Sequence, residues 1–341
     1  MLHLPSLPSG TRVQDTLLVM EVSTHATDEG HPYTILTLGN STGEIPTAPF
    51  WLEQQDQVAG LRRGHAVQVI GDVVPYRDRR QLKVMSLRLL PAGTVDLRSL
   101  LPSVGPVERY WEKLDLRRRE IRKPRLARVV NLFYADDGFR ERYGQCPASI
   151  RGHHARLGGL LKHTVEVTAI ARTIGRACGA DLDIVVAGAL LHDIGKLESY
   201  AWDGVFEYTE PGSLLGHVVL GALMLDRRLR AEPEPPCTDR ERDVLLHLVL
   251  AHHGRLEFGS PIPPMTLEAE VLHWADNASA KTASVADALR DARHLAAGAV
   301  TGPLASLDRR RLYTGASDWG ADEAPSDPRS PRRALDPDER S

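Results

Sequence analysis

Histidine and aspartate recur at the ends of apolar segments in the second half of the chain. Of the 14 histidines, nine lie between His153 and His273. A polar group inside an apolar helix costs free energy unless it is bonded, and one such histidine is more often satisfied by a hydrogen bond than by a metal. Five imidazoles and two carboxylates in the same setting are better satisfied together, by a shared metal centre. The candidate ligands are His163, His192, Asp193, His217, His252, His253 and Asp276.

The donor types restrict the metal. Neutral imidazoles and carboxylates without a thiolate suit Mn²⁺, Fe²⁺, Co²⁺, Ni²⁺ or Zn²⁺ rather than Ca²⁺ or a cysteine-based zinc site. Seven ligands exceed what one ion needs, whereas two ions about 3.5–4 Å apart use them if one carboxylate bridges the pair. Such a pair lowers the pKa of a bridging water and clamps a phosphoryl oxygen, which is the chemistry of phosphodiester hydrolysis.

The segments that carry these residues have helical spacing. From Leu157 to about Ala297 the chain predicts one helix after another, and GGLLKHTVEVTAIARTIGRA has a broad apolar face. Between Asp96 and Ser149 helical spacing is interrupted by prolines, which predicts a helical connector able to pack on either neighbour. After Leu307 the composition turns to Arg, Asp, Pro and Ser, which predicts a disordered tail.

The first part of the chain predicts strands. TLLVMEV, YTILTL and AVQVIGDVV show partial alternation, and turn residues separate them. Five strands between Thr16 and Leu90, with a short helical piece near Glu53–Ala59, are typical of a small OB-type barrel. The expected organisation is multidomain, with an all-β OB-fold barrel at 11–92, a helical connector at 93–150, an all-α metal-binding domain at 151–300 and a tail at 308–341.

Composition sets broad limits on function. The chain has 341 residues, with 42 Lys and Arg against 45 Asp and Glu, a formal charge of −3, so bulk positive charge does not drive nucleic-acid binding. The three cysteines form no C-x-x-C pair, which argues against a disulfide framework. MLHLPSLPSG does not resemble a signal peptide, and no apolar run is long enough to span a bilayer. These observations predict a cytoplasmic protein with no membrane partner.

The order of the motifs resembles a known family. His163, the His192–Asp193 doublet and Asp276 match the H…HD…D signature of the HD-domain metal-dependent phosphohydrolases. More closely, the chain is similar to the YhaM-type 3′→5′ exoribonucleases, which join an N-terminal OB-fold to an HD domain. The segments that carry this similarity are HHARLGGLLKHT, HDIGKLESY, LLGHVVLGA and HHGRLEFGSP. The resemblance covers roughly Thr11 to Ala297.

The resemblance implies a role for each candidate ligand. It assigns a first divalent ion, with Mn²⁺ as the first choice, to His163, His192, Asp193 and Asp276. It assigns a second ion, bridged by Asp193, to His217, His252 and His253. Lys196 lies one helical turn after the doublet, so its ammonium is expected to act with Asp193 in catalysis by stabilising a phosphoryl oxygen.

Predicted substrate contacts lie in both domains. The His153–His154 pair precedes the first metal-binding helix and matches a family segment, so it is a candidate for binding the substrate phosphate, with an ordinary surface pair as the alternative. In the barrel, Tyr76–Lys83 is the better candidate for RNA contact, because a core position is the first expectation for Tyr33 and for Trp51. Phe258 is a candidate for stacking on the terminal base. The expected basic contacts are Arg77, Arg79, Arg80 and Lys83.

The resemblance implies a metal-dependent 3′→5′ exonuclease that hydrolyses single-stranded RNA, with DNA as an alternative substrate, and releases nucleoside 5′-monophosphates. A cyclic-dinucleotide phosphodiesterase has a similar binuclear site but carries Gly-Tyr-Pro after the His pair, where this chain has HHGRLEFGSPIPP. A nucleotide phosphohydrolase would leave the barrel unexplained. A nucleic-acid-binding module with a non-catalytic metal site is the alternative of a different class, and the apolar connector helices leave room for a homo-oligomer.

Overall fold

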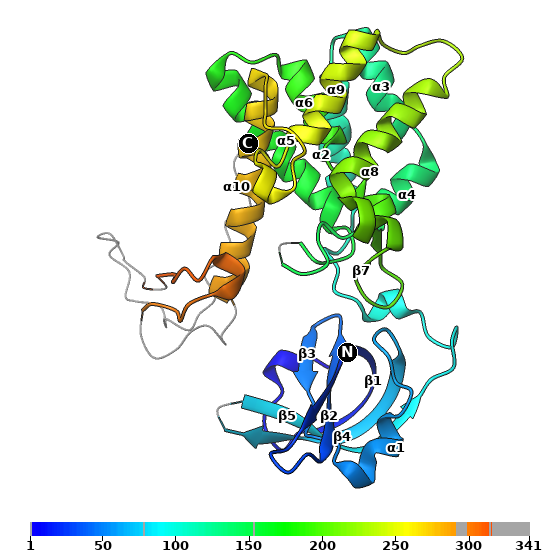
Figure 1. The fold of residues 1–341 in the computed structure, drawn as a ribbon, viewed down its shortest axis with the longest axis vertical. Helices are drawn as coiled ribbons and strands as arrows, with labels where there is room; N and C mark the ends of the chain where they lie inside the picture. Colours follow the sequence, from blue (N-terminus) through cyan, green and yellow to red (C-terminus); the bar gives the residue numbers. More distant parts are fainter. Residues whose placement is uncertain (1, 78, 153, 291–298, 314, 316–341) are drawn as a thin grey trace. The chain divides into compact units, whose positions relative to one another are not determined.

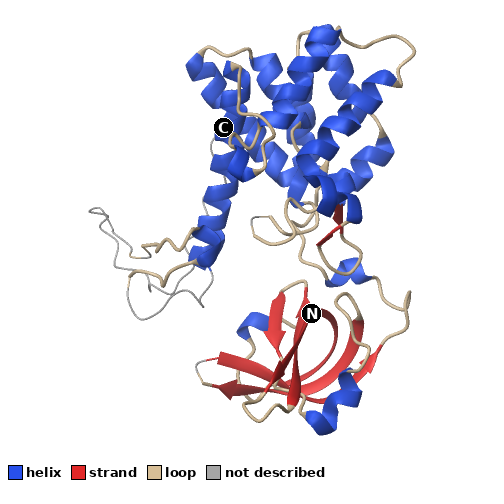
Figure 2. Ribbon diagram, viewed as in Figure 1, coloured by secondary structure: helices blue, strands red, loops and turns tan. Residues whose placement is uncertain are grey.

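The computed structural model describes residues 2–77, 79–152, 154–290, 299–313 and 315. The chain divides into two compact units, Met1–Asn277 and Ala278–Ser341. In the first unit a group of strands precedes a group of helices, and the helical part contains only a short hairpin of β6 (Tyr200–Ala201) and β7 (Glu207–Tyr208) among its described residues (Figure 2). This order confirms the predicted fold class, an all-β part followed by an all-α part.

Five antiparallel strands form the N-terminal barrel (Figure 1). They are β1 (Arg12–Ala26), β2 (Pro32–Asn40), β3 (Gly43–Pro46), β4 (Ala66–Tyr76) and β5 (Arg79–Leu89), in the order β3-β2-β1-β4-β5. A parallel bridge between Thr47 and Leu82 joins the chain after β3 to β5, which brings the two edges of the sheet together. The predicted helical piece is 3₁₀ helix η2 (Leu52–Gln54) followed by α1 (Gln55–Val58).

Alternation along the strands fills the barrel with apolar side chains. Leu36, Leu38 and Val67 are fully buried, and the period of two residues places such side chains on the same face of their strand. At Gly71 the register of β4 against β5 shifts, and a Cβ atom would lie 2.7 Å from the carbonyl oxygen of Lys83. The bulge therefore leaves no space for a side chain at this position.

The helices that follow the barrel share one apolar core. The first of them are 3₁₀ helix η3 (Leu97–Leu100), α2 (Glu108–Arg119), α3 (Pro124–Tyr134) and α4 (Asp137–Gln145). The Tyr134 hydroxyl donates to the carbonyl oxygen of Leu190 at 2.5 Å, and the Tyr143 hydroxyl lies 2.7 Å from Thr164 Oγ1. The segment predicted as a connector therefore packs against the helices that carry the candidate ligands, with its aromatic side chains in their core.

The remaining helices position the candidate ligands. They are α5 (Gly159–Cys178), α6 (Leu182–Leu191), α7 (Lys196–Ser199), α8 (Glu210–Arg230), α9 (Asp239–Ala251) and α10 (Leu267–Arg290). Helix α8 has a kink at Gly216, whose φ is 73°, immediately before His217. Thr238 caps α9 in a capping box with Glu241. Among the described helices, none has both the length and the apolar character that a membrane crossing requires.

The second unit contains the end of α10 and a small separate core. 3₁₀ helix η6 (Ala305–Leu307) lies between two isolated bridges, one of which joins Val300 to Tyr313. Ala288, Leu304 and Leu307 form the core. Most of the predicted tail, residues 314 and 316–341, lies outside the described residues, so its predicted disorder remains a prediction, as do the exact domain limits.

Candidate metal centre

Asp193 lies between the two groups of candidate ligands. It follows His192, which ends α6, and its carboxylate is almost completely buried. Oδ2 lies 3.1 Å from His192 Nε2 and 3.5 Å from His163 Nε2. Oδ1 lies 3.4 Å from His217 Nε2 and 3.7 Å from His252 Nε2. Each oxygen atom of one carboxylate therefore faces a different pair of imidazoles, which is the arrangement of a bridging ligand.

The first group consists of His163, His192, Asp193 and Asp276. Helix α5 supplies His163, the end of α6 supplies the doublet, and α10 supplies Asp276. Asp276 Oδ1 lies 2.9 Å from His163 Nε2 and 3.9 Å from His192 Nε2. A cation with ligand bonds of about 2.1 Å holds adjacent donors about 3 Å apart, so this spacing suits a single ion.

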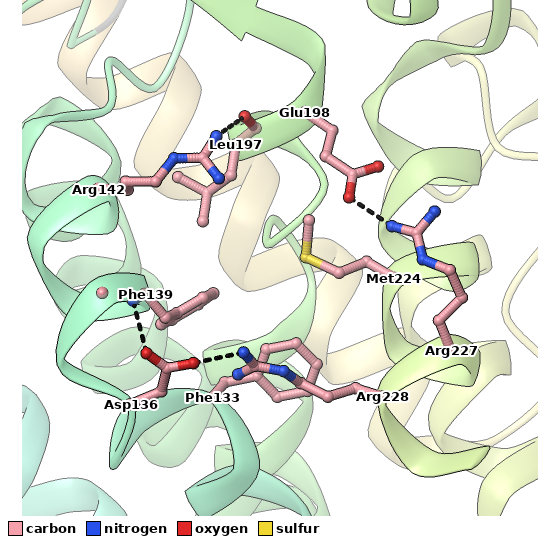
Figure 3. A pocket seen from close by; sticks show the side chains of 10 residues that line it. Phe133, Asp136, Phe139, Arg142, Leu197, Glu198, Met224, Arg227 and Arg228 are labelled. Atoms are coloured by element: carbon pink, nitrogen blue, oxygen red, sulfur yellow. Dashed lines mark hydrogen bonds and ion pairs between the residues drawn. The ribbon is translucent and has the colours of Figure 1, made fainter. Parts of the chain in front are cut away.

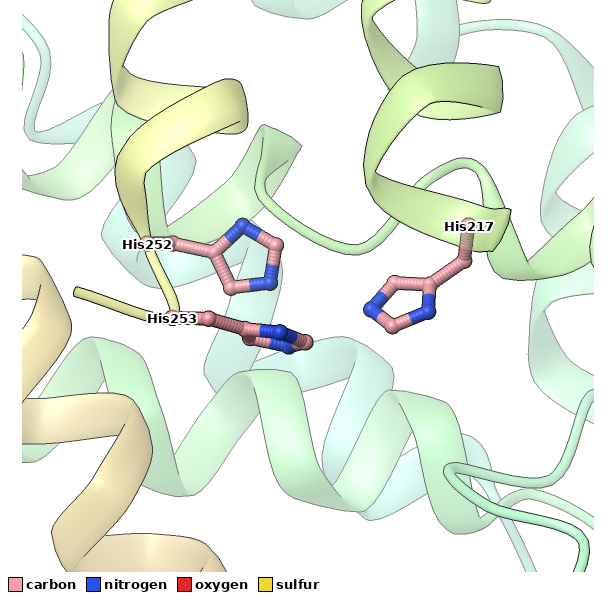
Figure 4. A group of neighbouring side chains, drawn as sticks. All are labelled: His217, His252 and His253. Carbon is pink, nitrogen blue, oxygen red and sulfur yellow. The ribbon is translucent and has the colours of Figure 1, made fainter. Parts of the chain in front are cut away.

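The second group consists of His217, His252 and His253 (Figure 4). His217 projects from α8 just after the kink, and the other two rings extend toward it from the end of α9. One donor atom from each residue lies within 4.8 Å of the others. His217 and His253 are only partly buried whereas His252 is fully buried, so this group is more open to solvent than the first.

The ends of helices α6 and α9 fix which ring nitrogen these histidines present. His192 Nδ1 lies 2.8 Å from the carbonyl oxygen of Ala189, and His252 Nδ1 lies 2.7 Å from that of Val249. A carbonyl oxygen only accepts hydrogen bonds, so each Nδ1 carries the proton and each Nε2 keeps its lone pair. His253 makes the same kind of bond to a backbone carbonyl. The tautomer needed for metal ligation through Nε2 is therefore built into the fold.

Four donor atoms in the centre are buried without a hydrogen-bond partner among the described residues. They are Asp193 Oδ1 and the Nε2 atoms of His192, His217 and His252. Buried polar atoms nearly always have a hydrogen-bond partner in native proteins. Four potential ligand atoms without one, all in the same place, therefore require another explanation. Imidazole nitrogen and carboxylate oxygen suit first-row divalent cations. The residues present therefore fit divalent metal ions, with one position beside each group.

Burial keeps most of these imidazoles in the form that binds metal. Burial, reinforced by the positive charge of Lys196, lowers the pKa of His217 to about 3. Burial also lowers the pKa of His163, and it takes the pKa of His252 well below its usual range. Burial alone would raise the pKa of Asp193, but Lys196 and the imidazoles hold it well below its usual range. His163, His217 and His252 thus offer neutral rings beside an ionised carboxylate, as metal binding requires.

His192 shifts in the opposite direction. Burial opposes its protonation, but the negative charges of Asp193 and Asp276 raise the pKa of this imidazole. A proton therefore competes with a cation for His192 Nε2, and metal binding at the first group is expected to release protons.

Lys196 begins α7 and holds Asp193 in place. Its side chain is buried, and Nζ lies 2.6 Å from Asp193 Oδ2, so the ammonium is paired with a candidate ligand and is not exposed to solvent. The turn before it lies directly against α8, because a Cβ atom at Gly195 would lie 2.1 Å from the carbonyl oxygen of His217 and 2.3 Å from the amide nitrogen of Gly221. Only glycine allows the first group to approach His217 so closely.

Comparison with known proteins identifies the family. The HD domain family matches residues 160–281, a range that contains every candidate ligand. The chain is 30% identical to the 3′-5′ exoribonuclease YhaM of Bacillus subtilis (strain 168) over 307 residues, which cover 89% of this chain and 95% of that protein. The protein of the same name from Oceanobacillus iheyensis is 32% identical, with 89% and 94% covered. The chain belongs to the YhaM family. The relative from Geobacillus sp. (strain WCH70) is 30% identical, with 89% of this chain and 92% of that protein covered.

In this member of the YhaM family, the residues predicted to contact substrate near the metal centre differ in their burial and in their hydrogen bonds. His153 lies outside the described residues. His154 is buried, has a φ of 51°, and places Nε2 2.8 Å from Glu166 Oε2, so the alternative of an ordinary surface position is wrong for it. Phe258 is 56% exposed, and its carbonyl oxygen accepts the Nδ1–H of His253 at 2.7 Å. An exposed ring is therefore tied through its backbone to a candidate ligand.

The basic residues predicted to contact RNA lie on the β4–β5 hairpin of the barrel. Arg77, Arg79 and Lys83 are exposed, and the guanidinium of Arg77 lies 5.4 Å from the ring centroid of Tyr76. Arg80 instead donates to backbone carbonyl oxygens of the N-terminal segment. These hydrogen bonds give Arg80 a structural role, which is to hold the N-terminal segment against the hairpin. The sequence did not indicate this role.

Two further histidines, His247 and His273, are on the same helices as candidate ligands but make hydrogen bonds elsewhere. His247 Nε2 accepts a hydrogen bond from the backbone amide of Met265 at 2.9 Å. His273 Nδ1 lies 3.0 Å from the carbonyl oxygen of His252 and so supports the residue that carries a candidate ligand. Sequence reasoning did not name Glu166, whose only signal is its position one helical turn after His163.

A cavity of about 510 Å³ borders α7 but contains none of the candidate ligands (Figure 3). Arg142 donates to the carbonyl oxygen of Leu197 at 2.8 Å, and Arg227 pairs with Glu198. These two bonds hold Leu197 and Glu198, the residues directly after Lys196.

Proposed function

We propose that this chain is a divalent-metal-dependent 3′→5′ exonuclease that hydrolyses single-stranded RNA and releases nucleoside 5′-monophosphates. One observation carries the proposal: the two oxygens of the buried Asp193 face separate histidine groups. That geometry suits phosphodiester hydrolysis assisted by two metals. The names of the relatives, 3′-5′ exoribonucleases that match along 89% of this chain, support the direction and the substrate.

The proposed cofactor is a pair of divalent ions, with Mn²⁺ as the first metal to test. The ligands proposed for the first ion are His163, His192, Asp193 and Asp276. Those proposed for the second are His217, His252, His253 and, as the bridge, Asp193. When bound, the ions lower the pKa of a water and neutralise charge on the phosphodiester.

The residues around the ions have complementary roles. Lys196 fixes the orientation of the Asp193 carboxylate, and its charge lies beside the position proposed for the phosphoryl group. The His153–His154 pair is proposed to contact the substrate phosphate, with His154 oriented by Glu166. Phe258, exposed next to His253, is proposed to stack on the terminal base.

The barrel is proposed to hold the upstream part of the strand. Arg77, Arg79 and Lys83 are exposed on one hairpin and available for phosphate contacts, whereas the side chain of Arg80 is occupied. In the structure, Cys146, Cys178 and Cys237 are free thiols, which is consistent with action in the reducing cytoplasm.

The test is hydrolysis of a 5′-labelled single-stranded RNA in Mn²⁺, with a DNA strand of matched sequence alongside. The proposal predicts a ladder of shortening labelled products and release of nucleoside 5′-monophosphates. Asp193→Ala should abolish the ladder, whereas His247→Ala should keep it, because His247 bonds to a backbone amide instead of facing the centre.

Two other outcomes would redirect the assignment. An intact RNA strand together with consumption of a cyclic dinucleotide or a free nucleotide would indicate another phosphohydrolase activity of the HD domain. Tight RNA binding without cleavage in any divalent metal would indicate a binding module with a non-catalytic metal site.

A further inference from the structure

Three aromatic rings form a row on the β-barrel. His25, near the end of β1, pairs directly with Tyr33 at the start of β2, and their ring centroids lie 5.3 Å apart at 27°. Tyr33 and Trp51 follow at 5.2 Å and 45°. Trp51 is 47% exposed while its neighbour Phe50 is buried in the barrel. The expectation of a core position is therefore wrong for Trp51.

The backbone around Trp51 holds the exposed indole in a defined position. The amide of Phe50 donates to the carbonyl oxygen of Thr34 at 2.8 Å, and the amide of Thr34 donates to that of Phe50 at 3.0 Å. Gln55 Nε2 donates to the Phe50 carbonyl at 2.6 Å, and Gln54 Oε1 accepts from the Trp51 amide at 3.3 Å. These bonds anchor both sides of Trp51, so the ring is exposed by a fixed backbone rather than by a loose loop.

We propose that His25, Tyr33 and Trp51, the aromatic row, bind bases of the single-stranded RNA substrate by stacking. This inference rests on the proposed function and adds a site to it. The exposed indole of Trp51, with two further rings beside it, offers an aromatic face to planar ligands, and nucleobases stack on such faces irrespective of sequence. Nearby acidic residues argue against phosphate contacts here, because the β1–β2 connection carries Asp28 and Glu29.

The aromatic row and the basic hairpin should respond differently to salt. Phosphate contacts release counterions, so their contribution weakens as salt rises. Stacking on Trp51 involves no charge on the protein and should be nearly independent of salt. The exposed Arg79 and Lys83 of the β4–β5 hairpin provide the electrostatic comparison within the same barrel.

The experiment measures binding by the full-length protein with its metal. The probe is a 5′-fluorescein oligo(A) of about 15 nucleotides, near the upper site size of one OB-fold, with phosphorothioate linkages at its 3′ end to prevent hydrolysis. Trp51→Ala should raise the Kd about 10-fold, and Trp51→Phe should raise it less because a ring remains. The matched control is Leu52→Ala, which removes an exposed side chain without a ring from the next residue and should leave the Kd unchanged.

Salt dependence and a second substrate separate the possible failures. The Trp51→Ala effect should be the same factor at about 50 mM and about 200 mM salt, whereas the Lys83→Ala effect should shrink at the higher concentration. Turnover of bis(p-nitrophenyl) phosphate by the wild-type protein and by Leu52→Ala should be the same, which checks the metal centre separately from the binding of an RNA strand. An unchanged Kd for Trp51→Ala would overturn the aromatic row. Failure of the proposed function would instead appear in the wild-type protein, as an RNA strand that is bound but not shortened.

Discussion

Asp193 and Lys196 form a buried ion pair whose members should respond to mutation as a unit. Nζ lies 2.6 Å from Oδ2, and the side chains are 7% and 1% exposed for Lys196 and Asp193 respectively. Removing one partner of a buried pair leaves an uncompensated charge and costs about 3–5 kcal/mol. We therefore expect Asp193→Asn and Lys196→Met each to lower the unfolding free energy of the metal-free protein by about 3 kcal/mol.

The double variant tests whether these losses share one cause. With both charges removed, no charge is left buried without its partner, so the combined loss should fall short of the sum by about 2–3 kcal/mol. Urea denaturation in EDTA, followed by circular dichroism, measures the three variants against the wild type. Losses that add within about 0.5 kcal/mol would refute the reasoning, because independent sites are additive to that degree.

Metal titration of the same proteins separates ligation from positioning. Asp193→Asn should weaken both ions, because each carboxylate oxygen faces one group of histidines. Lys196→Met should keep two ions but weaken them about 10–100-fold, as expected for a residue that orients a ligand. Loss of a single ion in Asp193→Asn would show that the carboxylate does not bridge.

Three further predictions address the helices around the centre. Between about pH 6.5 and pH 3 the imidazoles of the unfolded chain bind protons, whereas folded His217 stays neutral because its pKa is lowered to about 3. The unfolding free energy of the metal-free protein should therefore fall as the pH drops. Denaturation of His217→Gln across that range should show an unfolding free energy that depends less on pH. Gly195→Ala should displace α8, because the new Cβ would lie 2.1 Å from the His217 carbonyl oxygen, and calorimetric titration should show weaker binding of one ion while the other is retained. Thr238→Ala removes the hydroxyl that accepts from the Glu241 amide and should lower the unfolding free energy in urea by about 1 kcal/mol, with the metal stoichiometry unchanged.

Features with a strong local pattern could be predicted from the sequence. Alternation around Leu36 and Leu38 indicates a strand with one buried face. Lys196 is one turn from Asp193, so their contact follows from helical spacing. Trp51 shows the limit, because Phe50 and Trp51 have similar side chains in adjacent positions. Only the long-range pairing of Phe50 with Thr34 decides which ring enters the barrel and which stays exposed.

The His192–Asp193 and His252–His253 doublets each stand directly after the last residue of a helix, α6 and α9 respectively. His192 and His252 each end an apolar helix, and each Nδ1 bonds a carbonyl oxygen three residues earlier. The last carbonyls of a helix have no intrahelical partner, so a histidine at this position satisfies one of them and turns Nε2 away from the helix. Inside a helix the carbonyls are already bonded, and His247, within α9, makes its hydrogen bond to a distant amide instead. His192 and His252 thus present Nε2 because of their place at the helix end, which explains why the H-D and H-H doublets directly follow α6 and α9. His163 and His217 are different, because they lie within α5 and α8.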